Sequence, residues 1–144
     1  MKKDIILVDI DGTISLPGDR LKYLQGKKNW DAFYEACGED EPNMPVIRTV
    51  LALSTCYQIV YCTGRRKGVA EKTVEWLRKY SLWGGNEVLL MRPDGDHRHD
   101  TEVKPELVEH IKGRILCILE DRASMVAKWR ELGYTCLQVA EGNF

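Results

Sequence analysis

The chain has 144 residues, of which 44% are hydrophobic and 30% are charged, and its formal net charge is -1. This length suits one domain, residues 1–144, around one core. The balance of 21 basic and 22 acidic residues excludes a global basic field for nucleic acid, although a local basic groove stays possible. No apolar run suits a membrane span, and Asp4 and Asp9 interrupt the stretch where a signal peptide would be apolar. We therefore expect a cytoplasmic protein without membrane contact.

The five cysteines are odd in number and lack CxxC spacing. They lie mostly inside apolar runs, which favours reduced thiols in the core. Cys62 has an alternative interpretation as a reactive thiol, because it adjoins the loop of a candidate active site. The set is Cys37, Cys56, Cys62, Cys117 and Cys136.

Hydrophobic periodicity predicts strands that alternate with helices along the chain. In chain order we expect a strand at 4–9, a helix at about 45–57, a strand at 58–62, a helix at about 69–80, a strand at 87–91, a helix at 105–112, a strand at 114–119, a helix at 122–132 and a strand at 135–139. This alternation indicates a parallel α/β sheet covered on both faces.

Residues 12–43 form the one long irregular stretch, with a short aromatic helix at 30–36. The stretch exceeds the usual length of a connection, which predicts a flap or small cap over a functional site. In parallel α/β sheets ligands bind outside the carboxyl ends of the strands, so the polar residues that follow each strand are the first candidates for a site.

Two carboxylates, Asp9 and Asp11, follow the first strand, and Gly12 permits a sharp turn. One such acid can attack phosphorus while its neighbour donates and accepts the proton. The alternative is an ordinary Asp-Gly turn.

Thr63, Gly64 and Arg65 follow the second strand and are predicted to open a helix, where a hydroxyl and backbone N–H groups can hold a phosphate oxygen. Thr63 alternatively serves only as the helix N-cap. Lys104 precedes Pro105 at the predicted start of the next helix, where the helix dipole does not favour a cation. It is either drawn into the site by negative charge or simply exposed.

Glu120 and Asp121 close the fourth strand. Together with Asp9 they form an oxygen-rich set of the kind that suits Mg²⁺. The alternative for Asp121 is an N-cap of the following helix.

In this order, the DxDGT string at Asp9, the Thr63 hydroxyl, Lys104 and the terminal acidic pair resemble the motifs of the haloacid dehalogenase (HAD) superfamily over essentially the whole chain. The resemblance implies a Rossmannoid three-layer sandwich with a parallel central sheet and a minimal flap after the first strand. It also implies a phosphatase. By this resemblance Asp9 would be the nucleophile and Asp11 the general acid and base. Thr63 and Lys104 would bind the phosphate. Mg²⁺ would be held by Asp9, the Asp11 backbone carbonyl and the Glu120–Asp121 pair, with Asp121 favoured as the ligand.

The strings at 57–66, 95–107, 120–133 and 136–144 are similar to the 3'-phosphatase domain of phage polynucleotide kinases. By that likeness Arg65 and Asp100 match active-site positions, and Arg20 matches an arginine of the flap. We expect substrate contacts from Gly64, Arg65, Arg20, Arg98 and Asp100. Alternatively, Asp100 orients Lys104 or Arg65 instead of touching substrate.

A flap of this size leaves room for a polymer end, with basic residues along the rim and Tyr23, Trp30 or Tyr34 free to stack a base. The alternative for these aromatic residues is the apolar face of a short helix. His97 and His99 lack further ligands for zinc, so the loop around them is interpreted as a substrate contact.

The expected reaction is therefore Mg²⁺-dependent removal of a 3'-phosphate from nucleic-acid ends. The alternatives are a phosphatase of free nucleotides or other small metabolites, and a non-enzymatic module that binds phosphate ends. No GxxxxGK[ST] loop occurs, so we expect no kinase activity, and no obligate protein partner is inferred.

Overall fold

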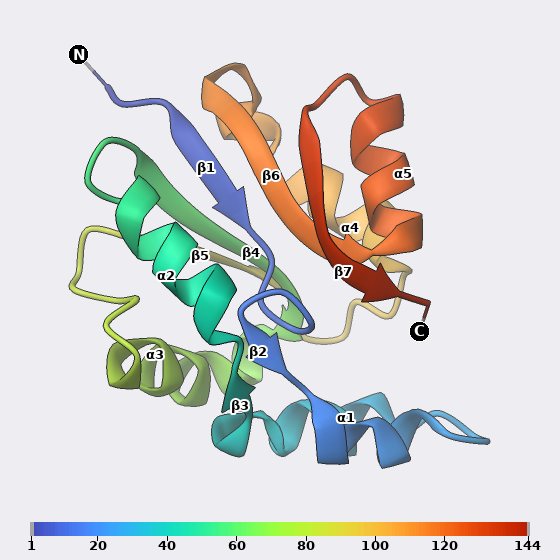
Figure 1. Ribbon diagram of the computed structural model, residues 1–144. Helices are drawn as coiled ribbons and strands as arrows, with labels where there is room; N and C mark the ends of the chain where they lie inside the picture. The colour runs from blue at the N-terminus through green and yellow to red at the C-terminus, as the bar shows by residue number, and fades with distance from the viewer. Residues whose placement is uncertain (1, 144) are drawn as a thin grey trace.

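A computed structural model describes residues 2–143 of the chain. Its centre is a parallel five-stranded sheet in the order β5-β4-β1-β6-β7 (Figure 1). The strands are β1 (Ile5–Val8), β4 (Gln58–Arg66), β5 (Val88–Arg92), β6 (Ile115–Arg122) and β7 (Cys136–Gly142). The predicted α/β class with a parallel central sheet is confirmed.

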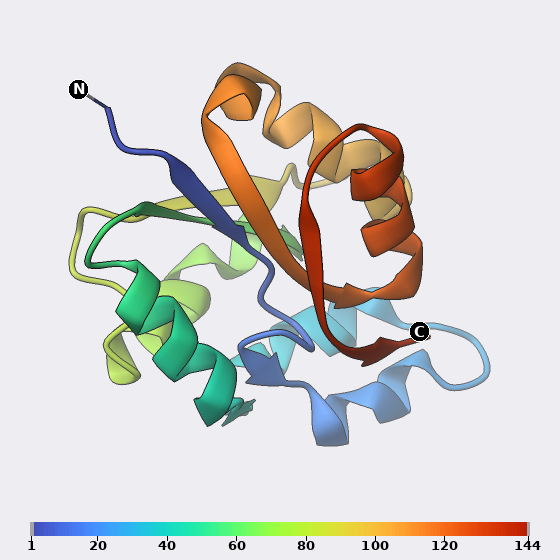
Figure 2. The same cartoon turned by 45° about the horizontal axis from the view of Figure 1, so that its top comes forward.

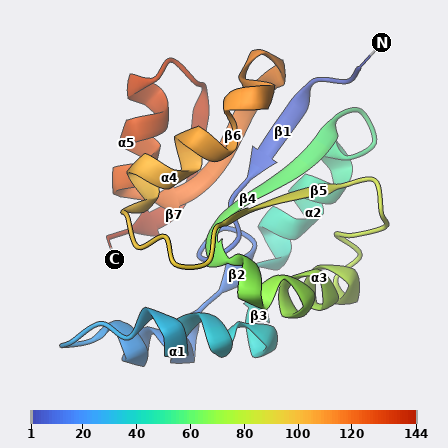
Figure 3. The ribbon, with the colours of Figure 1, turned by 180° about the vertical axis from the view of Figure 1, so that it is seen from behind.

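Helices cover both faces of this sheet (Figures 1 and 3). On one face lie α2 (Met44–Leu53) and α3 (Ala70–Lys79), and on the other lie α4 (Asp100–Leu107) and α5 (Ala123–Glu131). Alternate residues of β1 enter the two resulting cores, with Ile6 beside Ile47 of α2 and Leu7 beside Trp129 of α5. Burial on both faces explains why β1 is apolar throughout, since each such side chain contributes roughly 1.5–3 kcal/mol.

The segment after β1 folds over the carboxyl ends of the strands (Figure 2). It contains β2 (Ser15–Leu16), the 3-10 helices η1 (Gly18–Leu24) and η2 (Cys37–Glu39), α1 (Trp30–Glu35) and β3 (Glu41–Pro42). Strands β2 and β3 pair antiparallel. Phe33 and Tyr34 pack against Val69 and Met91 in a third apolar cluster, which fixes this flap to the sheet.

Several predicted boundaries are wrong: α2 ends at Leu53 and not near 57, and β7 runs to Gly142 and not to 139. Three further errors change the position of a candidate residue. Strand β4 runs on to Arg66, and α3 begins at Ala70 after the 3-10 helix η3 (Lys67–Val69). Thr63 therefore neither opens nor caps a helix. Strand β6 likewise runs to Arg122, which is itself the N-cap of α5, so Asp121 is not a cap either. Both strands gain hydrogen bonds from neighbours that local periodicity does not reveal.

The third error concerns α4, which begins five residues before the predicted start and contains Pro105 in its interior. The His99 ring nitrogen accepts a hydrogen bond from Thr101 N–H at 3.2 Å, and acidic residues fill the first turn. The residues after Val108 form a separate 3-10 helix, η4 (Glu109–Arg114). Lys104 therefore lies within the helix and not before it.

The cysteines are free, and Cys37, Cys62 and Cys136 are buried as expected, whereas Cys56 is exposed. Burial raises the pKa of Cys62 to about 12, which does not support the alternative of a reactive thiol there. Among the described residues no helix is long and apolar enough to cross a membrane.

Candidate active site

Asp9 follows β1 directly and is held on both sides of its carboxylate. Lys104 Nζ donates a hydrogen bond to Oδ1 at 2.7 Å, and the Thr13 hydroxyl donates to Oδ2 at 2.9 Å. Only 5% of Asp9 is exposed. The central strand and two buried donors thus fix the position and orientation of this carboxylate.

Lys104 reaches from α4 across the sheet end to two acids. Its Nζ also donates to Glu120 Oε2 at 2.9 Å, and the residue is 2% exposed. Burial alone would lower the pKa of the Lys104 ammonium, but the charges of Asp9 and Glu120 outweigh it and hold that pKa well above its ordinary value. Lys104 is therefore a fixed positive charge at the centre of the site.

Asp9, Glu120 and Asp121 bring carboxylate oxygens within 4.8 Å of one another. Both oxygens of Glu120 are engaged, one by Lys104 and the other by the Asp121 backbone N–H at 3.2 Å. Asp121 accepts from the Thr13 hydroxyl at 3.3 Å, and burial together with the nearby Asp9 charge raises its pKa to about 7. Three acids around one lysine leave an excess of negative charge, and their hard oxygen atoms fit a cation such as Mg²⁺.

Gly12 allows the backbone to pass close to the cluster of Asp9, Glu120 and Asp121. Its φ of +88° lies in the left-handed region, and a Cβ at this position would overlap the Asp121 carboxylate. The DxDG string therefore provides two carboxylates and also a backbone that can approach Asp121.

Asp11 lies under two arginines. Arg65 Nη2 and Arg20 Nη2 each donate to Asp11 Oδ1 at 2.7 Å. Burial raises the pKa of Asp11, but the two guanidinium groups outweigh it and hold that pKa far below its usual range. In this structure Asp11 is therefore an anion and not a proton donor.

The same arginines connect the flap to the sheet through Asp40. Arg20 donates to Asp40 through both Nε, at 2.6 Å, and Nη2, while Arg65 Nη2 lies 3.4 Å from the same carboxylate. Arg20 also packs its guanidinium 4.3 Å from the centre of the Phe33 ring. Sequence reasoning missed Asp40, because one carboxylate in the acidic run at 39–41 gives no local signal.

Thr63 and Gly64 both lie in β4. Gly64 lines the small cavity at Asp9, whereas Thr63 is buried and is not among the residues that line it. The Thr63 hydroxyl accepts from the Arg65 backbone N–H at 3.1 Å. At Gly64 a Cβ would lie only 2.5 Å from Asp100 Oδ1. Strand β4 and the start of α4 approach each other closely at this point.

Asp100 is held by two arginines that the sequence did not single out. Its carboxylate accepts from Arg92 Nη2 and, at 3.1 Å, from Arg122 Nη1. These partners replace the Lys104 or Arg65 of the alternative interpretation. Arg92 is buried and also donates to the Gly64 carbonyl at 2.9 Å, so it fastens the β4 loop and Asp100 to one another. The sequence could have pointed to Arg92, because this arginine lies at the carboxyl end of a strand, where ligands of such sheets bind.

Arg98 lies farther out, on the rim. Its guanidinium binds Asp96 at 2.9 Å and Glu106 at 2.8 Å, and 42% of the side chain is exposed. It does not line the narrow cavity above Asp9, whose volume is about 20 Å³ and which Trp30 and Tyr34 of the flap also line. That space holds about one water molecule, so the flap lies close over Asp9.

The fold is that of the HAD-like hydrolases. The haloacid dehalogenase-like protein SP0104 from Streptococcus pneumoniae matches with a TM-score of 0.63 at 13% identity, over 94% of this chain and 84% of that one.

The family of the polynucleotide kinase PNKP phosphatase domain matches residues 3–144, and the chain belongs to that family. It is therefore a phosphatase of the HAD type, as the sequence motifs predicted.

Two larger proteins are more similar in sequence. A chain in the structure of the Pnkp1/Rnl/Hen1 RNA repair complex has a TM-score of 0.81 at 32% identity, over 99% of this chain and 44% of that one. A protein of Autographa californica nuclear polyhedrosis virus, named "Putative bifunctional polynucleotide kinase/RNA ligase", is 30% identical over 132 residues, which are 88% of this chain and 18% of that protein. The chain thus spans less than half of either relative.

Proposed function

We propose that this phosphatase removes the 3'-phosphate from nucleic-acid ends through a phosphorylated Asp9. The observation that carries the proposal is the buried Asp9 carboxylate, fixed by Lys104 and Thr13 inside the acidic cluster. Membership of the PNKP phosphatase family supports a polynucleotide end as the substrate. The relative in an RNA repair complex supports the same class of substrate.

In the first step a carboxylate oxygen of Asp9 attacks phosphorus, and the bond from phosphorus to the 3' oxygen of the leaving chain breaks. Lys104 donates a hydrogen bond to Asp9 and offsets the charge of the incoming phosphate. The Thr63 hydroxyl and the backbone at Gly64 would bind the phosphate beside Asp9. Water then hydrolyses the phosphoaspartate and restores the free carboxylate.

Asp11 donates the proton to the leaving oxygen and takes one from the attacking water. It is ionised in the described state because Arg20 and Arg65 bind it. We propose that an incoming phosphate draws these guanidinium groups away, since they form strong paired hydrogen bonds to phosphate. The pKa of Asp11 would then rise, and Asp11 would take up from solvent the proton that it gives to the leaving oxygen. Substrate binding would thus convert Asp11 to its acid form.

Mg²⁺ would be held by Asp9, Asp121 and the backbone carbonyl of Asp11. When bound it neutralises charge on the phosphate and on the acidic cluster. Glu120 would hold Lys104, which donates to its Oε2 at 2.9 Å.

The test is phosphate release with and without Mg²⁺ from a 3'-phosphorylated oligonucleotide, its 5'-phosphorylated isomer and free 3'- and 5'-nucleotides. Asp9→Asn is the negative control, after circular dichroism has shown that it is folded. We expect Mg²⁺-dependent release mainly from the 3'-phosphorylated oligomer and none by Asp9→Asn.

Faster release from the free nucleotides would indicate that the substrate is a small metabolite, and it would leave the role of Asp9 unchanged. Full activity of Asp9→Asn would disprove the mechanism. Absence of release from every member, with tight binding of the 3'-phosphorylated oligomer, would favour a module that binds phosphate ends.

A further inference from the structure

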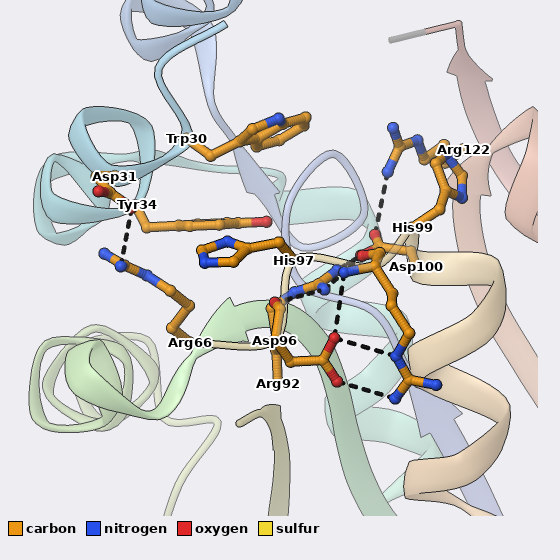
Figure 4. Close-up of a pocket in the computed structure, with 11 residues that line it drawn as sticks. Trp30, Asp31, Tyr34, Arg66, Arg92, Asp96, His97, His99, Asp100 and Arg122 are labelled. Atoms are coloured by element: carbon orange, nitrogen blue, oxygen red, sulfur yellow. Dashed lines mark hydrogen bonds and ion pairs between the residues drawn. The ribbon is translucent and has the colours of Figure 1, made fainter. Parts of the chain in front are cut away.

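A second cavity, of about 280 Å³, opens beside the narrow one above Asp9 (Figure 4). The flap contributes Trp30 and Tyr34 to its wall, and the loop before α4 contributes His97. The two cavities share Trp30, Tyr34, Asp100 and Arg122, so they adjoin one another. A molecule whose phosphate reaches Asp9 therefore has this space next to it.

One wall of the second cavity is aromatic. Trp30 and Tyr34 have ring centres 5.8 Å apart and an interplanar angle of 27°, and Figure 4 shows the His97 imidazole beside the Tyr34 ring. Tyr34 is 7% exposed and packs against Phe33, so the platform is rigid before any ligand arrives. A preformed platform saves the entropy of ordering these side chains during binding.

The wall of the cavity also carries a guanidinium with an unused donor, beside helix α1. Arg66 comes from the end of β4, and its Nη1 pairs with Asp31 of α1 at 2.8 Å. Its Nε is buried and has no hydrogen-bond partner among residues 2–143. A buried N–H of this kind is suited to an acceptor that arrives with a ligand.

These features identify the ligand chemistry. An aromatic platform suits the flat face of a nucleobase, and an arginine N–H suits a phosphodiester or sugar oxygen. A phosphosugar would leave the rings without a partner. The volume is slightly below the range of about 300–1,000 Å³ of ordinary ligand pockets, which suits one nucleotide and not a longer segment.

Resting on the proposed function, we propose that this cavity binds the terminal nucleotide whose 3'-phosphate is removed. Its base stacks on Trp30 and Tyr34, and its backbone accepts a hydrogen bond from Arg66. The enzyme would thereby recognise the last base of an end by its aromatic face, without reading the sequence.

The test compares two 3'-phosphorylated oligonucleotides that differ only in the last residue, which carries a base in one and is abasic in the other. We expect wild type to show a KM about tenfold lower for the base-bearing end, with similar kcat. Trp30→Ala should remove that difference, and Trp30→Phe should restore most of it. Tyr23→Ala is the matched control, since Tyr23 lies in the flap but outside this cavity.

Equal KM values of wild type for the two ends would overturn the stacking proposal. So would a Trp30→Ala protein that loses activity equally on both ends, because that result indicates a purely structural role. Binding of both oligomers to Asp9→Asn, followed by fluorescence anisotropy, repeats the comparison without turnover. If wild type releases phosphate from neither oligomer, the proposed function fails, and this binding comparison still decides whether the cavity takes a base.

Discussion

At the scale of single residues, the site depends on charges that are buried and paired. Asp9, Lys104 and Glu120 are each at most 5% exposed, and Lys104 is their shared partner. Such pairs contribute little net stability, but loss of one partner is costly because it leaves a buried charge uncompensated. The pairing therefore makes Lys104 important for the fold as well as for the proposed catalysis.

We expect Lys104→Met to destabilise the protein by about 3–5 kcal/mol and to abolish phosphate release, because Asp9 and Glu120 lose their counter-ion. Urea unfolding measures the first effect, and the oligonucleotide assay measures the second. Lys112→Met is the control, since Lys112 forms an exposed pair with Glu109. A Lys104→Met protein of wild-type stability would contradict the interpretation of Lys104 as a buried charge between two acids.

Asp100 gives a prediction about pH. Burial opposes its ionisation, but Lys104, Arg122 and Arg92 outweigh burial and lower the pKa of Asp100. A carboxyl whose pKa falls on folding adds stability above its unfolded pKa of about 3.9, and this stability is lost as the pH falls through the folded pKa. The contribution is therefore complete at neutral pH and fades in acid.

We expect Asp100→Asn to cost about 1.5–3 kcal/mol of unfolding free energy between pH 8 and about pH 5, and progressively less below about pH 4. Urea titrations across this range provide the measurement, with Asp4→Asn at the exposed N-terminal segment as control. A cost that stays constant into acid would show that Asp100 contributes by packing and not by charge.

At the scale of elements, the site requires β4 and α4 to approach closely. The contact falls at Gly64, where any side chain would meet Asp100. Arg92 holds the same junction from β5 through the Gly64 carbonyl. The flap is held in a similar way, since its Arg20 binds Asp11 and its Asp40 meets Arg65 of β4.

We expect Gly64→Ala to lower kcat/KM by about 100-fold while the protein stays folded, because the added methyl group displaces Asp100 or the β4 loop by a fraction of an ångström or more. Gly113→Ala is the matched control, since nothing lies within 4 Å of a Cβ at that glycine. Steady-state kinetics on the 3'-phosphorylated oligomer provide the measurement. Wild-type kinetics for Gly64→Ala would mean that the junction adapts without loss.

At the scale of the whole molecule, the acidic cluster connects metal binding to folding. Asp9, which follows β1, meets Glu120 and Asp121 of β6 only in the folded state, where the carboxylates repel one another. A cation that binds this state stabilises it by mass action. The negative charge that attracts a cation to the acidic cluster thus lowers the stability of the metal-free protein.

We expect Mg²⁺ at 100 times its Kd to stabilise wild type by about 2.7 kcal/mol, measured as a rise in Tm in scanning calorimetry. Asp121→Asn should abolish this rise. Without metal the same variant should be at least as stable as wild type, because it removes a negative charge beside Asp9. Glu131→Gln is the control, because Glu131 is an exposed acid at the end of α5, and it should keep the full rise in Tm. An undiminished rise in Tm for Asp121→Asn would show that the ion binds elsewhere.

The sequence by itself determined the architecture and the superfamily, and it supplied the candidate catalytic acids. Apolar periodicity identified the strands, and the order of motifs at Asp9, Thr63, Lys104 and the Glu120–Asp121 pair identified the superfamily. These features are readable because each one is local. A buried strand must be apolar, and residues that follow parallel strands meet at one edge of the sheet.

Only the tertiary structure decided how these groups are partnered. Arg65 donates a hydrogen bond to Asp11, which lies 54 positions away in the sequence, and Lys104 donates one to Asp9, which lies 95 positions away. The lengths of β4 and β6 likewise depend on hydrogen bonds with β5 and β7. Periodicity reports which face of an element is buried but not which distant side chain it meets, because that choice is made by packing of the whole chain.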